Sequence, residues 1–69
     1  MAEPLYRRIA ADLKSQIESG TLRPGDKLPS TRELVELYDV SETVIRYVMV
    51  ELKAQNLVEG RPGRGVFVR

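Results

Sequence analysis

Residues 41–46 carry side chains whose types and spacing suit the binding of a polar, negatively charged partner. Ser41 is a favourable N-cap, so a helix is expected to begin here with backbone N–H groups that attract an anion. Arg46 could bind guanine or a phosphate, Thr43 could bond a base or a phosphate, and Val44 could pack on a thymine methyl. The simpler interpretation is that Ser41 only caps the helix and Arg46 is a solvated helix residue.

A second group of candidates, Arg61, Gly63 and Arg64, lies in the segment Arg61-Pro62-Gly63-Arg64, whose Pro-Gly pair demands a tight turn. An arginine at the tip of such a turn can enter a minor groove or bind phosphates. Gly63 would let a backbone approach closely. The alternative is that the two arginines only keep an exposed turn soluble.

Two further candidates lie nearby. Arg32 stands at the start of a predicted helix, where it could contact a phosphate or pair with Glu36 four residues later. Tyr47 and Val50 fall on the predicted solvent face of the helix that follows Ser41. They are candidates for contact with a partner, although single exposed apolar residues are common.

Three amphipathic helices, over residues 4–19, 31–38 and 42–55, are predicted to position these side chains. In each, apolar residues recur at intervals of three and four, which places them on one face. Pro4 fits the first helical position, and Gly20 fits the position just past the end of the first helix. The residues expected to face the core are Leu5, Tyr6, Ile9, Ala10, Leu13, Ile17, Leu34, Leu37, Tyr38, Ile45, Val48, Met49 and Leu52.

Caps and turns separate these helices. Ser30-Thr31-Arg32-Glu33 is a capping box, and a turn at Asp39-Val40 leaves about three residues before the third helix, which is the helix-turn-helix arrangement. Pro24-Gly25 predicts a type II turn in the connector, anchored by Leu22 and Leu28. Lys27-Leu28 could add a very short strand.

The C-terminal residues are predicted to form a β-hairpin, with strands near 57–61 and 65–69. Val66-Phe67-Val68 is strongly β-prone, and the Pro-Gly pair supplies the turn. The expected fold is mostly α with a small β-hairpin (α+β). It is a winged helix-turn-helix of three helices plus a C-terminal wing, in one domain over residues 1–69.

Composition favours a small binding module over an enzyme. The 69 residues include no Cys and no His, which excludes disulfides, Cys-His and Ser-His catalysis and nearly all zinc or haem ligation. We therefore expect no catalytic residue, metal or cofactor. No apolar run approaches the roughly 18 residues that span a bilayer, and no signal peptide is visible, so a cytoplasmic protein is predicted. The net charge is only +1, but residues 41–69 hold five basic and three acidic residues.

The sequence resembles the N-terminal DNA-binding domain of the GntR family over about residues 4–69. The resemblance implies a bacterial transcription regulator, commonly a repressor, that binds double-stranded DNA at an inverted-repeat operator. It also implies homodimerisation through a C-terminal domain absent from this sequence, which would bind any small-molecule effector. The segments that carry the resemblance are residues 5–10, residues 20–30, Arg32-Glu33-Leu34, Val40-Ser41, Thr43, Arg46 and residues 63–68.

The resemblance implies DNA contacts for Arg32, Ser41, Thr43, Arg46 and Gly63. Two positions depart from the family pattern. Glu42 stands where a basic residue that reads guanine is common, and Val44 stands where a second Thr is common. Glu42 could accept a hydrogen bond from a cytosine amino group, or it could be repelled by the phosphates.

A protein-interaction winged helix is the alternative function, because fold alone does not fix function. The low net charge and Glu42 favour this alternative, whereas the arginine-rich wing and the motifs that resemble the GntR family oppose it. Salt dependence separates the two, since DNA binding weakens steeply with ionic strength through counterion release.

Overall fold

The computed structural model describes residues 4–69, and its first element is α1 (Leu5–Glu18). Pro4 is the residue just before the helix rather than its first residue, so that part of the expectation was one residue off. Gly20, with φ of 85°, follows the helix end as predicted. Ile9, Ala10 and Leu13 are buried, whereas Leu5 is about half exposed.

The connector contains the predicted type II turn. Gly25 has φ of 90°, and the Asp26 N–H donates to the Arg23 carbonyl at 2.9 Å. The Asp26 carboxylate also accepts a hydrogen bond from the Arg23 N–H at 2.9 Å, so two hydrogen bonds between these residues stabilise the turn. Leu28 is buried and Leu22 packs against the core, so both anchor the connector as expected.

α2 (Thr31–Tyr38) and α3 (Glu42–Ala54) form the helix-turn-helix. The capping box is present in full. The Glu33 N–H donates to Ser30 Oγ at 3.1 Å, and the Ser30 N–H donates to Glu33 Oε1 at 3.0 Å. Between the helices, Asp39 adopts a left-handed conformation with φ of 53°, which a short polar side chain tolerates. Ser41 caps α3 by accepting from the Val44 N–H at 3.3 Å.

The prediction that Leu37 is buried was wrong, because its side chain is 69% exposed. α2 turns Leu34 fully into the core and packs Val35 and Tyr38 against it. In a helix of only eight residues, the spacing of apolar residues leaves the direction of the buried face loosely defined.

The wing is an antiparallel hairpin of β1 (Val58–Arg61) and β2 (Gly65–Val68). Its turn is the predicted Pro-Gly turn, with φ of 74° at Gly63 and a 2.9 Å bond from the Arg64 N–H to the Arg61 carbonyl. Lys27 forms an isolated β-bridge with Phe67, and the Leu28 N–H donates to the Val66 carbonyl at 2.8 Å. The connector therefore pairs with β2 at a single bridge and does not form the very short strand expected at Lys27-Leu28.

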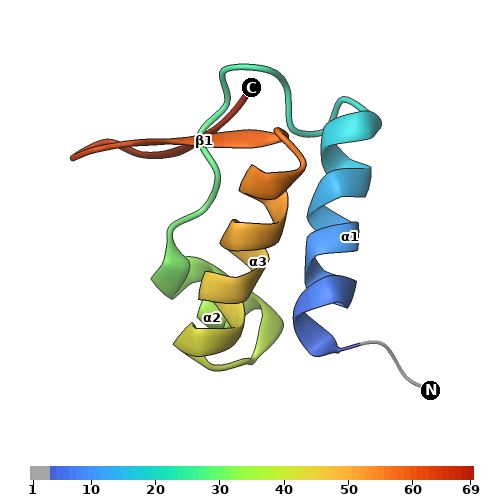
Figure 1. Ribbon diagram of the computed structural model, residues 1–69, viewed down its shortest axis with the longest axis vertical. Coiled ribbons are helices and arrows are strands. Elements are labelled where there is room, and N and C mark those ends of the chain that lie inside the picture. Colours follow the sequence, from blue (N-terminus) through green and yellow to red (C-terminus); the bar gives the residue numbers. More distant parts are fainter. Residues whose placement is uncertain (1–3) are drawn as a thin grey trace.

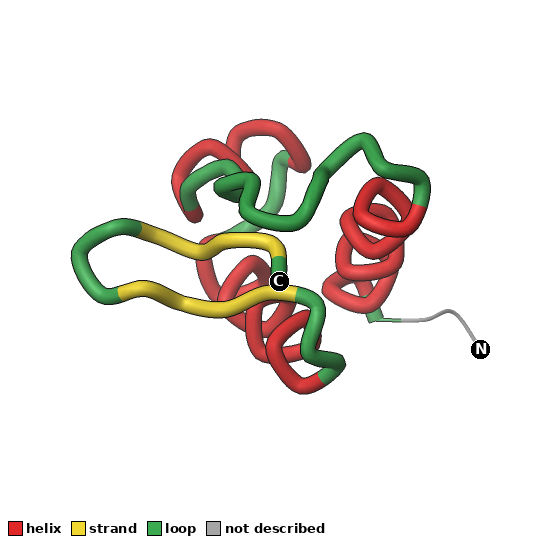
Figure 2. The backbone as a smooth tube through the Cα atoms, turned by 90° about the horizontal axis from the view of Figure 1, so that it is seen from above, coloured by secondary structure: helices red, strands yellow, loops and turns green. Residues whose placement is uncertain are grey.

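The helices and the hairpin enclose one core. α1 and α3 lie side by side, and the hairpin crosses the C-terminal end of α3 and projects away from α1 (Figure 1; Figure 2). None of the helices within residues 4–69 is long and apolar enough to cross a membrane. The buried residues are Ile9, Ala10, Leu13, Leu28, Leu34, Ile45, Val48, Met49, Leu52, Val58 and Val68.

Candidate nucleic-acid interface

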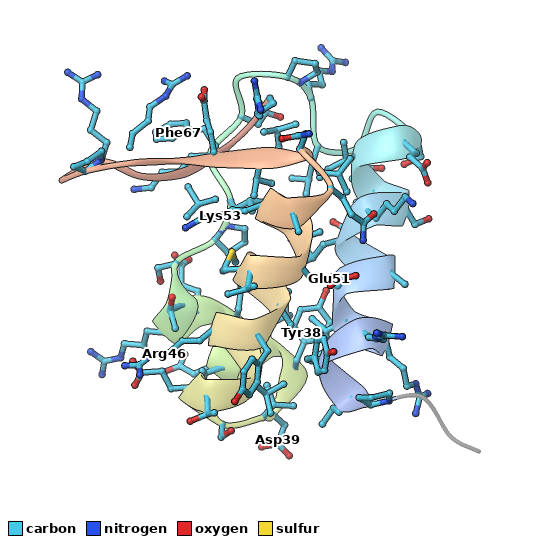
Figure 3. The ribbon with its side chains drawn as sticks, in the orientation of Figure 1. Tyr38, Asp39, Arg46, Glu51, Lys53 and Phe67 are labelled. Atoms are coloured by element: carbon cyan, nitrogen blue, oxygen red, sulfur yellow. The ribbon has the colours of Figure 1, made fainter. Side chains whose placement is uncertain are left out.

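One surface of the molecule combines the outer side of α3 with the adjoining side of the hairpin. Burial of Ile45, Val48, Met49 and Leu52 turns the opposite side of α3 to solvent. Arg46 and Lys53 lie on the side of α3 from which the hairpin projects (Figure 3). We call this the α3–wing surface, and define it by the exposed α3 residues Thr43, Arg46, Val50 and Lys53 and the hairpin residues Gly60 and Val66.

Arg46 is held by a partner that the sequence analysis missed. Its Nη2 donates to Glu42 Oε1 at 2.9 Å, and the two side chains are 72% and 62% exposed. The spacing of four residues, with the acid first, is the favourable arrangement for such a pair, so the signal was present in the sequence. The pair keeps the guanidinium on the first two turns of α3, where it faces solvent.

The candidate residues at the start of α3 differ in how much of each side chain a ligand can reach. Thr43 is exposed, so its hydroxyl is accessible to a ligand. Ser41 already accepts a bond from the Val44 N–H, as its capping role predicts. Val44 is partly buried and packs against the core, which leaves less of its side chain to contact a thymine methyl.

Tyr47 is 57% exposed, and one side of it faces α1. Its ring centroid lies 5.7 Å from that of Tyr6, with the rings tilted by 46°. Aromatic pairs at this separation attract each other. Tyr47 therefore helps to hold α1 against α3 and presents only part of its ring to a partner.

Arg32 lies at the start of α2, next to the shallow hollow that α2 forms with Glu42. Its Nε lies 4.0 Å from Glu36 Oε1, so the pair expected from the spacing does form. The two side chains are 91% and 74% exposed, and pairs so open to water contribute little. Arg32 therefore remains available to a ligand near the N-terminus of α3.

The two arginines of the wing, Arg61 and Arg64, lie in different surroundings. The Arg61 guanidinium lies 4.5 Å from the centroid of the Phe67 ring and donates to Glu59 Oε1 at 3.0 Å. Phe67 lies on the hairpin face turned away from α3, whereas Lys53 approaches the opposite face (Figure 3). Arg61 is thus restrained on the outer face, while Gly63 and Arg64 form the exposed tip. Sequence reasoning missed the role of Phe67, because the pairing of the strands brings Arg61 and Phe67 together.

Two groups in the scaffold have shifted pKa values. Hydrogen bonds from the backbone and side chain of Ser30 lower the pKa of Glu33, which favours the ionised capping box. Burial, followed by the bond to Asp12, raises the pKa of Tyr38 to about 12. The Tyr38 hydroxyl donates to Asp12 Oδ2 at 2.6 Å and so ties α2 to α1. Within residues 4–69, no cluster of acidic side chains could hold a metal ion.

The comparisons with known proteins agree with this geometry. The profile of the bacterial regulatory proteins of the gntR family matches residues 5–68. The chain is 44% identical over 64 residues to the Exu regulon transcriptional regulator of Escherichia coli K12, covering 93% of this chain and 25% of the relative. It is 38% identical over 65 residues to the transcriptional repressor NagR of Bacillus subtilis, covering 94% of this chain and 27% of the relative.

Among solved structures, the DNA-binding domain of AraR in complex with operator ORR3 matches with a TM-score of 0.94 at 30% identity. The match covers 100% of this chain and 83% of the AraR chain. The chain spans about a quarter of the length of the curated relatives named above. The chain therefore belongs to the GntR family of bacterial regulatory proteins, as a winged helix-turn-helix DNA-binding domain of that family.

Proposed function

We propose that this domain binds operator DNA by placing the N-terminal half of α3 in the major groove, as part of a transcription repressor. The observation that carries the proposal is the α3–wing surface, where Arg46 is exposed on the side from which the hairpin projects (Figure 3) and Thr43, three residues earlier on α3, is also exposed. In a helix-turn-helix, the first residues of the second helix contact base edges while the preceding helix crosses the backbone.

Each candidate residue then has a distinct part. Arg46 binds guanine or a phosphate, and Thr43 bonds a base or a phosphate. Arg32 contacts the backbone from α2, and Gly63 with Arg64 approaches the minor groove or the phosphates. Glu42, Val44 and Tyr47 line the same region, and Ser41 presents the helix N-terminus. Arg61 takes part after its guanidinium leaves Phe67 and Glu59, or by contact along the outer face of the hairpin.

The repressor acts as a homodimer on an inverted repeat. The name of NagR as a repressor and the AraR domain solved on its operator support this part of the proposal. Dimerisation and any small-molecule effector belong to a further domain outside this sequence. The domain performs no catalysis, requires no cofactor and works in the cytoplasm.

A protein-binding role is the second candidate. Tyr47 and Val50 are 57% and 63% exposed, and the net charge is only +1. An interface built on these apolar residues would change little with salt, whereas counterion release makes DNA binding fall steeply as salt rises.

Selection from a pool of random duplexes tests the proposed function. We expect the chain to enrich one short recurring sequence, found singly or as inverted pairs, and its affinity for this sequence to drop steeply with salt. Enrichment of no sequence, together with salt-independent retention of duplexes, would contradict the proposal.

A further inference from the structure

Lys53 is the second basic residue of the α3–wing surface, after Arg46. Arg32, Arg46 and Arg61 each lie within 4.0 Å of an acidic side chain. Lys53 forms no ion pair with any residue in 4–69, the portion that the structure describes, and its side chain is exposed. Its positive charge is therefore available to a ligand.

The position of Lys53 is set by both α3 and the hairpin. Lys53 follows Arg46 by seven residues, so the two lie on almost the same side of α3, about 10 Å apart along its axis. Lys53 Nζ lies 3.4 Å from the point where a Cβ on Gly60 would stand. The ammonium group therefore lies against Gly60, in the angle between α3 and the hairpin (Figure 3), and a Cβ at position 60 would make only an ordinary van der Waals contact with it.

We infer that Lys53 binds a backbone phosphate of the DNA strand that runs between the groove entered by α3 and the wing. This inference rests on the proposed function. When the N-terminus of a recognition helix contacts base edges, residues two turns later lie nearer to the groove wall, where the phosphates are. A lysine is a compact charge on a flexible stem, which suits a phosphate contact that positions the protein without reading sequence.

Lys53 also supplies a charge that the hairpin itself does not provide on this side. Arg61 is drawn to the outer face by Phe67 and Glu59. On the face turned toward α3, the hairpin offers Gly60 and Val66, which carry no charge. Lys53 therefore provides a positive charge beneath the wing.

The variant Lys53→Gln tests the inference by removing the charge from an exposed side chain. Its affinity for a short random-sequence duplex and for the selected sequence would be measured by fluorescence anisotropy at several salt concentrations. Each neutralised phosphate contributes about −0.9 to the slope of log affinity against log salt, so the slope should become shallower by about 1. A fourfold rise in salt should then shrink the affinity advantage of the parent about 3.5-fold to fourfold, equally on both duplexes.

Two further variants define the controls. Lys53→Arg keeps the charge and should keep the slope of the parent. Lys14→Gln removes the same charge from α1, on the far side of α3 from the hairpin, and should leave the slope unchanged.

Several results would overturn the inference. The first is a slope of log affinity against log salt that is unchanged in Lys53→Gln, and the second is a slope that changes equally in Lys14→Gln. The third is a Lys53→Gln variant that melts far below the parent, which would reveal a structural role. If the parent chain itself bound no duplex DNA, the proposed function would fail together with the inference. Tight parental binding with an unchanged slope in Lys53→Gln would refute the lysine contact alone.

Discussion

Replacing Glu42 by Gln tests how the acid at the start of α3 controls the arginine beside it. Glu42 Oε1 accepts from Arg46 Nη2 at 2.9 Å, and both side chains are more than half exposed. An i, i+4 ion pair this open to water is worth about 0.3–0.5 kcal/mol, and a base or phosphate must compete with it for the guanidinium. Glu42→Gln should therefore raise the affinity for random duplex DNA by about twofold. Discrimination at one base pair of the operator should fall.

The same substitution should lower the stability of the domain. An acid in the first turn stabilises a helix by about 0.3–1 kcal/mol through the helix dipole. The pair with Arg46 adds about 0.3–0.5 kcal/mol. We expect a loss of about 0.5–1.5 kcal/mol, where each 1 kcal/mol lowers the Tm of a domain of this size by about 4–8 °C.

Titrations on operator and random duplexes at two salt concentrations, together with thermal melting, measure both effects. Glu51→Gln is the matched control, because it removes the same charge from α3 on the side that faces α1 (Figure 3). If Glu42→Gln left both affinities unchanged while stability fell, Glu42 would act only on the helix, and the proposed competition for Arg46 would be refuted.

Three other predictions concern the scaffold and the state of the chain. Leu52→Ala or Ile45→Ala should cost about 2–5 kcal/mol in chemical denaturation, because both side chains are 0% exposed; a cost below 1 kcal/mol would contradict this core. The pKa of Tyr38 is raised to about 12 in the folded domain from about 10. The stabilisation that the Tyr38 hydroxyl contributes should therefore be fully present below pH 10 and be lost as pH rises through about 12. Tyr38→Phe should lower the free energy of unfolding by about 1 kcal/mol at neutral pH, and its stability should decline less at alkaline pH. Sedimentation should find the chain mostly monomeric, and a stable dimer at micromolar concentration would overturn that expectation.

The secondary structure was predictable because its signals are local. Ser30 and Ser41 cap the two helices that they precede, and the Pro-Gly pairs form the two turns expected of them. The exposure of Leu37 could not be predicted from such local signals. Two turns of helix carry too few apolar residues to fix which side faces the core, and here Val35 packs against it instead.

The candidate site was predictable as a set of positions but not as a set of contacts. The helical period placed Thr43 and Arg46 on the outer side of α3, where the structure has them. The stacking of Arg61 on Phe67 depends on the strand register that pairs Arg61 with Gly65, and no local spacing encodes that register. The approach of Lys53 to Gly60 likewise depends on how the hairpin crosses α3.

Operator binding by Arg46→Ala tests the central claim most directly. The Arg46 side chain is 72% exposed, so its removal opens no cavity. The free energy of unfolding should therefore change by less than about 1 kcal/mol. A bidentate contact to guanine is worth about 1–3 kcal/mol, so affinity for the selected operator should fall by about fivefold to 150-fold. Arg8→Ala, which removes the same charge from the exposed side of α1, should bind almost as the parent does. An Arg46→Ala variant that bound the operator as tightly as the parent would contradict the placement of α3 in the major groove.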